Sequence, residues 1–208
     1  MRLFSFALLS MVLFTAPSFA QSPADYGMET DDLPVGLMVG DEVTSSVLTN
    51  VSGEELSLVN DGYTVVFFYR GSWCPYCTRH LSALSDSLPF ILERADRVIA
   101  LTPQVEEEEL EIAIELAGMN LDIVVDESGE WMKYFDVDFV VTQAYQEKII
   151  NNLHTSLGET NGQREVVLPV PAAYIIDSDG RIIWRYFDIN YRKRPSPSVI
   201  FENLPSAS

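Results

Sequence analysis

Residues 63–77 read YTVVFFYRGSWCPYC, a run of β-branched and aromatic residues followed closely by two cysteines. The first seven residues of this stretch are nearly all apolar, which is typical of a central strand buried on both faces of a sheet. After Pro75, apolar residues recur with the spacing of one helix face, at Cys77, Leu81, Leu84 and Leu88. The cysteine pair is therefore predicted at a strand-to-helix junction.

Such a junction suits cysteine chemistry. The thiolate is the nucleophile in disulfide exchange, and the N–H groups at a helix N-terminus favour the charged form. Cys74 precedes the predicted helix, while Cys77 lies one turn inside and can attack a mixed disulfide on Cys74. We expect Cys74 to be the more exposed and more acidic thiol and the first to attack a disulfide. Pro75 fits the first turn, where its missing N–H costs nothing, and Trp73 offers a substrate an apolar contact.

Other uses of the two cysteines, the only ones in the chain, fit less well. A structural zinc site needs about four ligands, and the only histidines are His80 and His154. A structural disulfide would close too short a loop to restrain the unfolded chain, and inert buried thiols do not explain the CxxC spacing. We expect His80 to be solvated, with proton acceptance as the alternative. No metal or cofactor is expected.

The remaining pattern predicts an α/β domain. Strands alternate with helices and end in a hairpin around Ser178-Asp179-Gly180, which indicates a mixed central sheet flanked by helices on both faces. The predicted strands are 47–50, 56–59, 63–69, 98–101, 121–125, 172–176 and 181–186. Beyond the helix that follows Pro75, helices are predicted at 110–117 and 131–135, and at 145–153 within an insertion over 138–163.

The first 20 residues predict export. Residues 1–20 carry Arg2, an apolar run and the small-x-small ending Ser18-Phe19-Ala20, which is the pattern of a secretory signal peptide cut before Gln21. An uncleaved anchor is the alternative, and we expect no membrane span in the mature chain. Residues 21–36 are predicted as a flexible arm and 37–208 as the domain. The protein would be periplasmic in a Gram-negative bacterium and secreted otherwise.

Charge restricts the partners. The chain has 31 Asp and Glu against 13 Lys and Arg, a net charge of −18. Loss of residues 1–20 would remove Arg2 and no acid, which leaves −19. Nucleic acid and anionic lipid would be repelled by this surface. Glu106 to Glu109 are expected to begin a helix, where acids complement the helix dipole.

Residues 69–77 (YRGSWCPYC) resemble the AhpC/TSA peroxiredoxin-like family of the thioredoxin superfamily. The resemblance spans about residues 40–195. It continues at 101–104 (LTPQ), at 126–137 (DESGEWMKYFDV), at 169–177 (PVPAAYIID) and at Asp179-Gly180.

This resemblance implies a thioredoxin-like fold and an oxidoreductase with an antioxidant role. It also implies that Pro171 is a cis proline packed against the cysteines, with Val170 offering backbone hydrogen bonds to a bound peptide or thiol. A cis X–Pro bond is physically reasonable where a proline enters a strand, and Pro169 is the rival position. The candidate substrate-binding residues are Trp73, Pro75, Tyr76, Val170 and Pro171.

The sequence also departs from its relatives. Typical peroxiredoxins carry the motif Pro-x-x-x-Thr-x-x-Cys, which ends in the peroxide-reactive cysteine. If Cys77 is the counterpart of that cysteine, Arg70 replaces the proline of the motif and Cys74 replaces its threonine. Typical thioredoxins carry a buried acid six residues before their first active-site cysteine, and here that residue is Phe68. Three functions stay open: a disulfide reductase led by Cys74, a thiol peroxidase led by Cys77, and a non-catalytic binding domain. For the enzymes, the partners would be a disulfide or hydroperoxide and an electron-donor thiol protein or small thiol.

Overall fold

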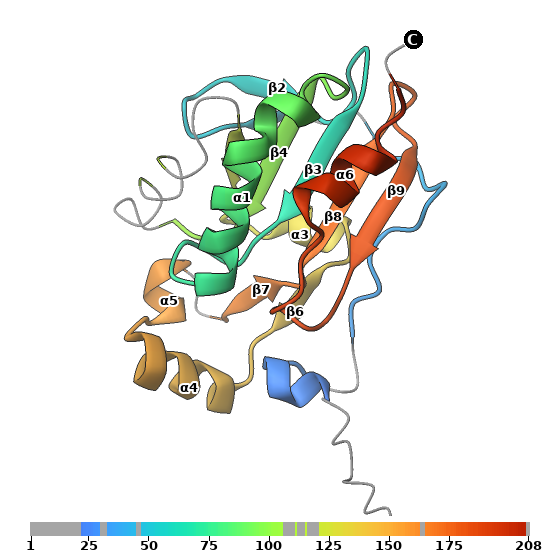
Figure 1. Cartoon of the computed structure of the whole chain (residues 1–208). Coiled ribbons are helices and arrows are strands. Elements are labelled where there is room, and N and C mark those ends of the chain that lie inside the picture. Colours follow the sequence, from blue (N-terminus) through green and yellow to red (C-terminus); the bar gives the residue numbers. More distant parts are fainter. Residues whose placement is uncertain are drawn as a thin grey trace, which may run out of the picture.

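A five-stranded mixed sheet forms the centre of the computed structural model, which describes residues 22–29, 33–44, 47–105, 111, 115, 121–162 and 165–206 (Figure 1). The strand order is β5-β4-β3-β8-β9. The three strands β3, β4 and β5 run parallel, whereas β8 is antiparallel to β3 and β9 to β8, so the predicted mixed sheet is confirmed. The strands are β3 (Thr64–Phe68), β4 (Arg97–Thr102), β5 (Asp122–Val125), β8 (Ala172–Ile176) and β9 (Ile182–Phe187).

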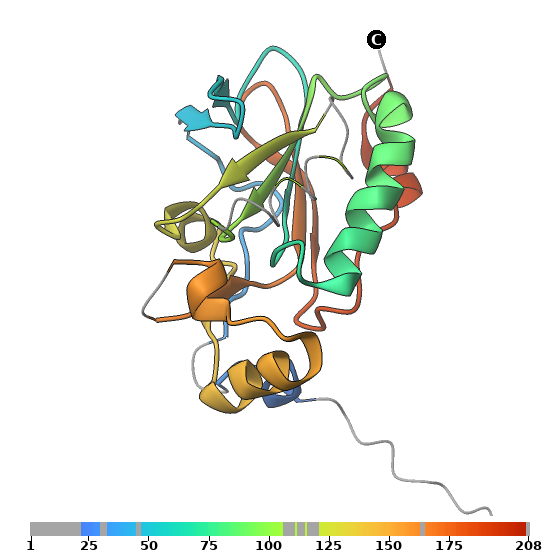
Figure 2. The same ribbon diagram turned by 90° about the vertical axis from the view of Figure 1, so that its left-hand side faces the viewer.

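Helices cover both faces of the sheet, as predicted (Figure 2). Helix α1 (Pro75–Ile91) and helix α6 (Pro197–Asn203) lie on one face, and α3 (Glu130–Tyr134) lies on the other. The predicted inner face of α1 is confirmed, because its four apolar residues are all buried: Cys77, Leu81, Leu84 and Leu88. Every residue of β3 is buried as well, which explains why that strand has almost no polar residues.

Short elements surround this centre. The predicted first hairpin is present as β1 (Val47–Thr49) and β2 (Glu55–Ser57). The insertion contains α4 (Gln143–Leu153), where a helix was predicted, and α5 (Leu157–Thr160). It also contains β6 (Asp138–Val140), which pairs with β7 (Val167–Pro169). That pair was not predicted, because three-residue strands are too short to show an alternating pattern.

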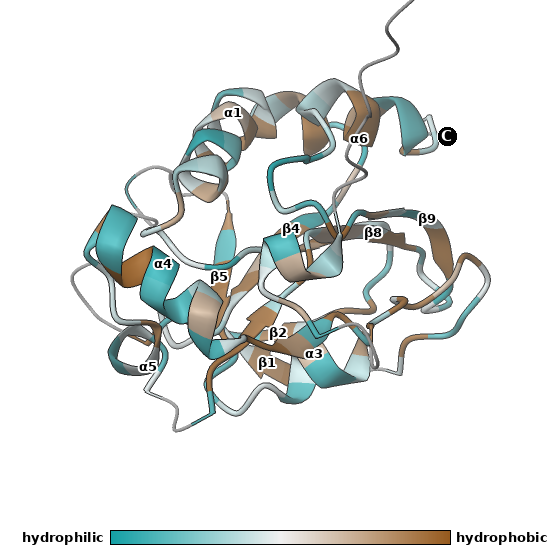
Figure 3. Cartoon of the chain, turned by 90° about the horizontal axis from the view of Figure 1, so that it is seen from below, coloured by the Kyte–Doolittle hydropathy of each residue, from teal (hydrophilic) through white to brown (hydrophobic). Residues whose placement is uncertain are grey.

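Residues 22–29 are packed against the domain, although residues 21–36 were expected to be a flexible arm. They form a short 3₁₀ helix, η1 (Pro23–Tyr26), and both its last residue, Tyr26, and the nearby Met28 are buried in the core. Thr142 N donates to Gly27 O over 2.9 Å, which joins this segment to the start of α4. Gly27 has a φ of 88°, and a Cβ there would collide with the Tyr145 ring. Figure 3 shows α4 with apolar residues between polar ones, as expected for a helix buried on one side.

Two segments with predicted structure fall outside the described residues, and the expected helix start at Glu106 to Glu109 lies outside them as well. The signal peptide over 1–20 is one, and the helix over 110–117 is the other, apart from Glu111 and Glu115. Within the part of the chain that the structure describes, none of the helices has the length and hydrophobicity needed to cross a membrane.

Candidate active site

The cysteines lie at the junction between β3 and α1, where the loop is fixed by buried polar contacts. Ser72 N donates to Gln104 Oε1 over 2.6 Å, and Gln104 Nε2 donates to Ser72 Oγ over 3.0 Å. Gln104 itself is completely buried beyond the end of β4. Gly71 has a φ of 134°, and a Cβ at this position would collide with the Trp73 indole. These contacts stabilise the conformation of the loop that carries the cysteines.

Both cysteines are free thiols and both are buried. Cys74 is the N-cap residue of α1, and Cys77 N donates to Cys74 O over 2.9 Å within the first turn. Cys74 is 2% exposed and lines a pocket, whereas Cys77 is 0% exposed behind it. Cys74 is therefore the more exposed of the two thiols, as predicted, although the difference in exposed fraction is small.

The acidity of the pair is the reverse of the prediction. A hydrogen bond to Cys77 and burial raise the pKa of Cys74 well above its usual range. Burial alone would also raise the pKa of Cys77, but the hydrogen bond from Cys74 and the charge of Arg194 outweigh it and lower this pKa to about 5. Arg194 Nη2 lies 3.2 Å from Cys77 Sγ. The prediction considered only the helix N-terminus and missed this arginine.

We expect Arg194→Gln to raise the pKa of the more acidic thiol by at least about one unit, because the variant removes the guanidinium that contacts it. Thiolate absorbance near 240 nm and the pH dependence of alkylation measure this pKa in the reduced protein. Arg192→Gln is the matched control, because it removes the same charge from an exposed position two residues away. Equal shifts in both variants would mean that the contact with Cys77 has no special effect.

His80 is buried, and the prediction that it is solvated was wrong. It is 8% exposed, and its Nε2 lies 3.0 Å from Pro195 O, to which it donates because a carbonyl oxygen only accepts. Burial and the nearby Arg194 lower the pKa of His80 to about 4, so the ring is neutral near pH 7. His80 thus holds the backbone beside Arg194, which positions the arginine at Cys77.

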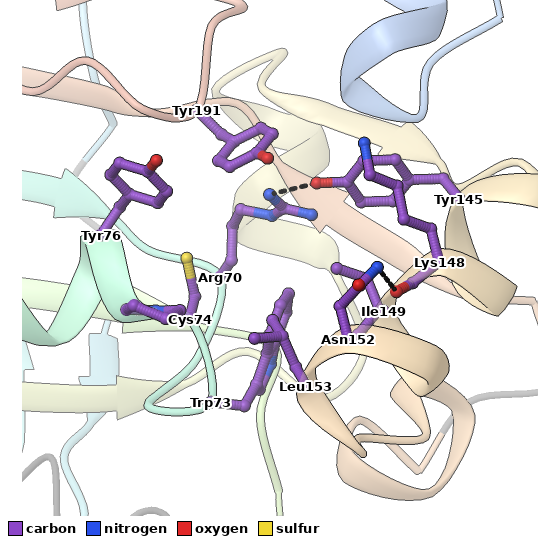
Figure 4. Close-up of a pocket in the computed structure, with 11 residues that line it drawn as sticks. Arg70, Trp73, Cys74, Tyr76, Tyr145, Lys148, Ile149, Asn152, Leu153 and Tyr191 are labelled. Carbon is purple, nitrogen blue, oxygen red and sulfur yellow. Dashed lines mark hydrogen bonds between the residues drawn. The ribbon is translucent and has the colours of Figure 1, made fainter.

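A pocket of about 270 Å³ opens beside Cys74 (Figure 4). Its walls come from the β3–α1 loop, the start of α1, helix α4 and the segment after β9. The predicted contact residues Trp73, Pro75 and Tyr76 all line it. The other lining residues are Arg70, Cys74, Tyr145, Lys148, Ile149, Asn152, Leu153 and Tyr191. The insertion thus supplies one wall of the site, a role that the sequence did not reveal.

Two of the predicted contact residues lie elsewhere. Val170 and Pro171 are buried and do not line this pocket. Val170 N donates to Val137 O over 2.7 Å, so this N–H is already occupied. The expected cis bond before Pro171 is absent: the described residues have no cis peptide bond. Pro171 directly precedes β8, so its missing N–H removes no bond from that strand's ladder and a trans bond is tolerated.

Several solved structures share this fold at low sequence identity. Peroxidoxin BcpB of Mycobacterium tuberculosis is 18% identical, with a TM-score of 0.57 over 80% of this chain and 95% of that one. A peroxiredoxin-like protein of Aquifex aeolicus is 14% identical, with a TM-score of 0.59 over 83% of this chain and 88% of that one. The fold is thioredoxin-like. In this fold, two free thiols lie at the start of α1, and the fold together with the thiol-disulfide oxidoreductases among the relatives reported below supports an oxidoreductase.

The sequence model of the AhpC/TSA family matches residues 39–185, and the chain therefore belongs to this family. Among curated proteins, the thiol-disulfide oxidoreductase ResA of Bacillus thuringiensis is 25% identical over 146 residues, which cover 70% of this chain and 67% of that protein. The sporulation thiol-disulfide oxidoreductase A of Bacillus subtilis is 24% identical over 99 residues, which cover 46% of this chain and 60% of that protein.

Proposed function

We propose that the protein is an exported thiol–disulfide oxidoreductase in which Cys74 and Cys77 cycle between dithiol and disulfide. One observation carries this proposal: Cys74 lines a pocket, while Cys77, which does not line it, accepts a hydrogen bond from Arg194 Nη2 over 3.2 Å. The hydrogen bond from Cys74 and the charge of Arg194 lower the pKa of Cys77 to about 5, which favours its thiolate near pH 7. The relatives named thiol-disulfide oxidoreductases support the same activity. A binding domain without turnover would have no use for a thiolate at Cys77.

In the proposed reaction, Cys74 attacks the substrate and Cys77 resolves the mixed disulfide that results. The Cys74 proton passes to the hydrogen-bonded Cys77 thiolate, and Cys74 then attacks a disulfide R–S–S–R as a thiolate to form a mixed disulfide. The released R–S⁻ takes up this proton from Cys77, which leaves Cys77 as a thiolate. Cys77 is already a thiolate, so it can attack Cys74 sulfur without a base and release the second R–S⁻. Two electrons pass to the substrate, and the protein is left with a Cys74–Cys77 disulfide. A donor dithiol returns it to the reduced form.

Export is part of the proposal and is tested separately. The support is the sequence of residues 1–20, whose apolar run and small-x-small ending fit a cleaved signal. Mass spectrometry of the exported protein is expected to find a chain that begins at Gln21. A chain that keeps residues 1–20 would contradict cleavage.

Hydroperoxide reduction is the second candidate, and the thiolate at Cys77 favours it. In this reaction Cys77 sulfur takes an oxygen atom from the peroxide to form a sulfenic acid and releases an alcohol or water. Cys74 then condenses with the sulfenic acid, which gives the same disulfide and water. Against this reaction, Cys77 is 0% exposed and lies behind Cys74.

Stopped-flow oxidation of the reduced protein distinguishes the two candidates. Tryptophan fluorescence reports the reaction, since Trp73 adjoins the pair. We expect a disulfide such as 2-hydroxyethyl disulfide to oxidise the protein faster than hydrogen peroxide at equal concentration, and dimedone to label little sulfenic acid. Faster oxidation by peroxide with dimedone on Cys77 would favour the peroxidase instead.

A further inference from the structure

We propose that the pocket beside Cys74 binds a carboxylate on the substrate through Arg70, so that the preferred substrates are small disulfides that carry carboxylates. This inference rests on the proposed disulfide exchange and adds a substrate class to it. The four observations that carry it are an unpaired buried cation, a second cation at the same pocket, the size of the pocket and the burial of Cys74.

Arg70 is a buried cation that has no carboxylate partner among the described residues. Its side chain is 2% exposed, and Nη1 donates to Tyr145 Oη over 3.2 Å. Its Nε and Nη2 atoms are buried and lack hydrogen-bond partners among the described residues. A buried guanidinium usually pairs with a carboxylate, yet in this acidic chain no described Asp or Glu forms an ion pair with Arg70.

Aromatic rings take the place of a carboxylate around Arg70. The guanidinium carbon lies 4.6 Å from the centroid of Tyr191, 5.2 Å from that of Trp73 and 5.3 Å from that of Tyr145. Figure 4 shows the Arg70 guanidinium between the rings of Tyr145 and Tyr191, with its hydrogen bond to Tyr145 drawn as a dashed line. Ring faces stabilise a cation but do not pair its Nε and Nη2 N–H groups, so these groups can donate to a carboxylate on the substrate.

Lys148 adds a second positive charge at the pocket. It lies on the exposed side of α4, and its Nζ is 5.6 Å from the centroid of Tyr145. The chain as a whole has a net charge of −18, which repels anions. Arg70 and Lys148 therefore place positive charge beside Cys74 on an otherwise acidic protein, and this charge attracts an anionic substrate.

The size of the pocket favours a small molecule. A volume of about 270 Å³ is just below the range of about 300–1,000 Å³ that is usual for ligand pockets, and the walls are largely aromatic and aliphatic. Cys74 is only 2% exposed, so a disulfide on a broad protein surface has poor access to its sulfur. A short chain with a carboxylate a few bonds from the disulfide can contact Arg70 and Cys74 together.

Three disulfides of similar length test the preference: dianionic 3,3′-dithiodipropionate, neutral 2-hydroxyethyl disulfide and dicationic cystamine. For each probe, kcat/KM with the full chain is divided by the rate constant for its reaction with dithiothreitol, which corrects for intrinsic reactivity. We expect the dianion to exceed the neutral probe by about tenfold to a hundredfold, because a charge-assisted bond to Arg70 forms only with the carboxylate. Cystamine is expected to be the poorest of the three.

Variants that remove the positive charges of the pocket test whether these charges cause the preference for the dianionic disulfide. Arg70→Gln is expected to reduce the ratio of dianionic to neutral kcat/KM to near one, and Lys148→Gln to lower it by about threefold. Lys148 is exposed, so its variant keeps the test valid even if Arg70→Gln fails to fold. Lys133→Gln removes one charge from an exposed site away from this pocket and is expected to keep the full ratio.

The outcomes separate the inference from the proposed function. Turnover of all three probes at equal corrected rates would overturn the carboxylate site and leave disulfide exchange standing. A preference for the dianion that survives in both pocket variants would also overturn it. Turnover of none of the probes would contradict disulfide exchange itself, and the inference with it.

Discussion

The Cys77→Ser variant is expected to accumulate a mixed disulfide with its substrate on Cys74, whereas Cys74→Ser is expected to accumulate none. The reason is positional: Cys74 lines the pocket, and Cys77 lies behind it as the only cysteine that can resolve the mixed disulfide. Without Cys77, the first exchange can still occur but the second cannot.

Turnover is expected to fall by at least about a thousandfold in both variants, since each cysteine is needed for one of the two exchanges. Non-reducing electrophoresis and intact-mass measurement after incubation with 2-hydroxyethyl disulfide detect the trapped adduct. Thr78→Ser, a conservative change beside the pair on a residue outside the pocket, serves as the folding control and is expected to turn over normally. An adduct in Cys74→Ser but not in Cys77→Ser would reverse the assigned order.

His80 is expected to make the fold less stable as the pH falls from about 6.5 to 4. Its pKa of about 4 in the folded protein lies below the ordinary 6.5, so the unfolded chain binds the proton first. The stabilisation is complete above the unfolded pKa and is lost as the pH falls toward the folded one. The difference between the two pKa values corresponds to about 3 kcal/mol, of which about 2 kcal/mol is lost between pH 7 and 5.

Urea denaturation from pH 5 to 7.5 measures this loss. The variants with and without His80 are compared in a protein that also carries Cys77→Ser, because titration of the Cys77 thiol would add its own pH dependence to the free energy of unfolding. Adding His80→Gln is expected to remove about 2 kcal/mol of the decline, and adding His154→Asn, which keeps His80, should retain it. The same decline with and without His80 would contradict its burial as a neutral ring.

Much of the fold could be predicted because its signals are local. The apolar run before Arg70 and the spacing of Leu81, Leu84 and Leu88 depend on near neighbours in sequence, and the structure confirms both elements. The pair β6–β7 is different, since each strand has three residues and its partner lies in a distant part of the chain. Tertiary pairing, rather than local pattern, determines such strands.

The site was only partly predictable for the same reason. The two cysteines are close in sequence to Trp73 and Tyr76. In contrast, Tyr145 lies 75 positions after Arg70, to which it is hydrogen-bonded, and Arg194 lies 117 positions after Cys77. Two signals were available. Arg70 is a charge at the end of a buried strand, and Arg192-Lys193-Arg194 is a basic cluster in an acidic chain. His80 was misjudged because a pattern along one helix cannot show that the segment around Pro195 covers it.

Peptide mapping after a single turnover tests the redox pair most directly. The reduced protein is mixed with one equivalent of 2-hydroxyethyl disulfide, alkylated and cut with trypsin, which releases residues 71–79 as one peptide. We predict that this peptide is two hydrogens lighter and unalkylated, with two equivalents of 2-mercaptoethanol released for each chain. A peptide that carries two alkyl groups after the reaction would contradict a Cys74–Cys77 redox pair.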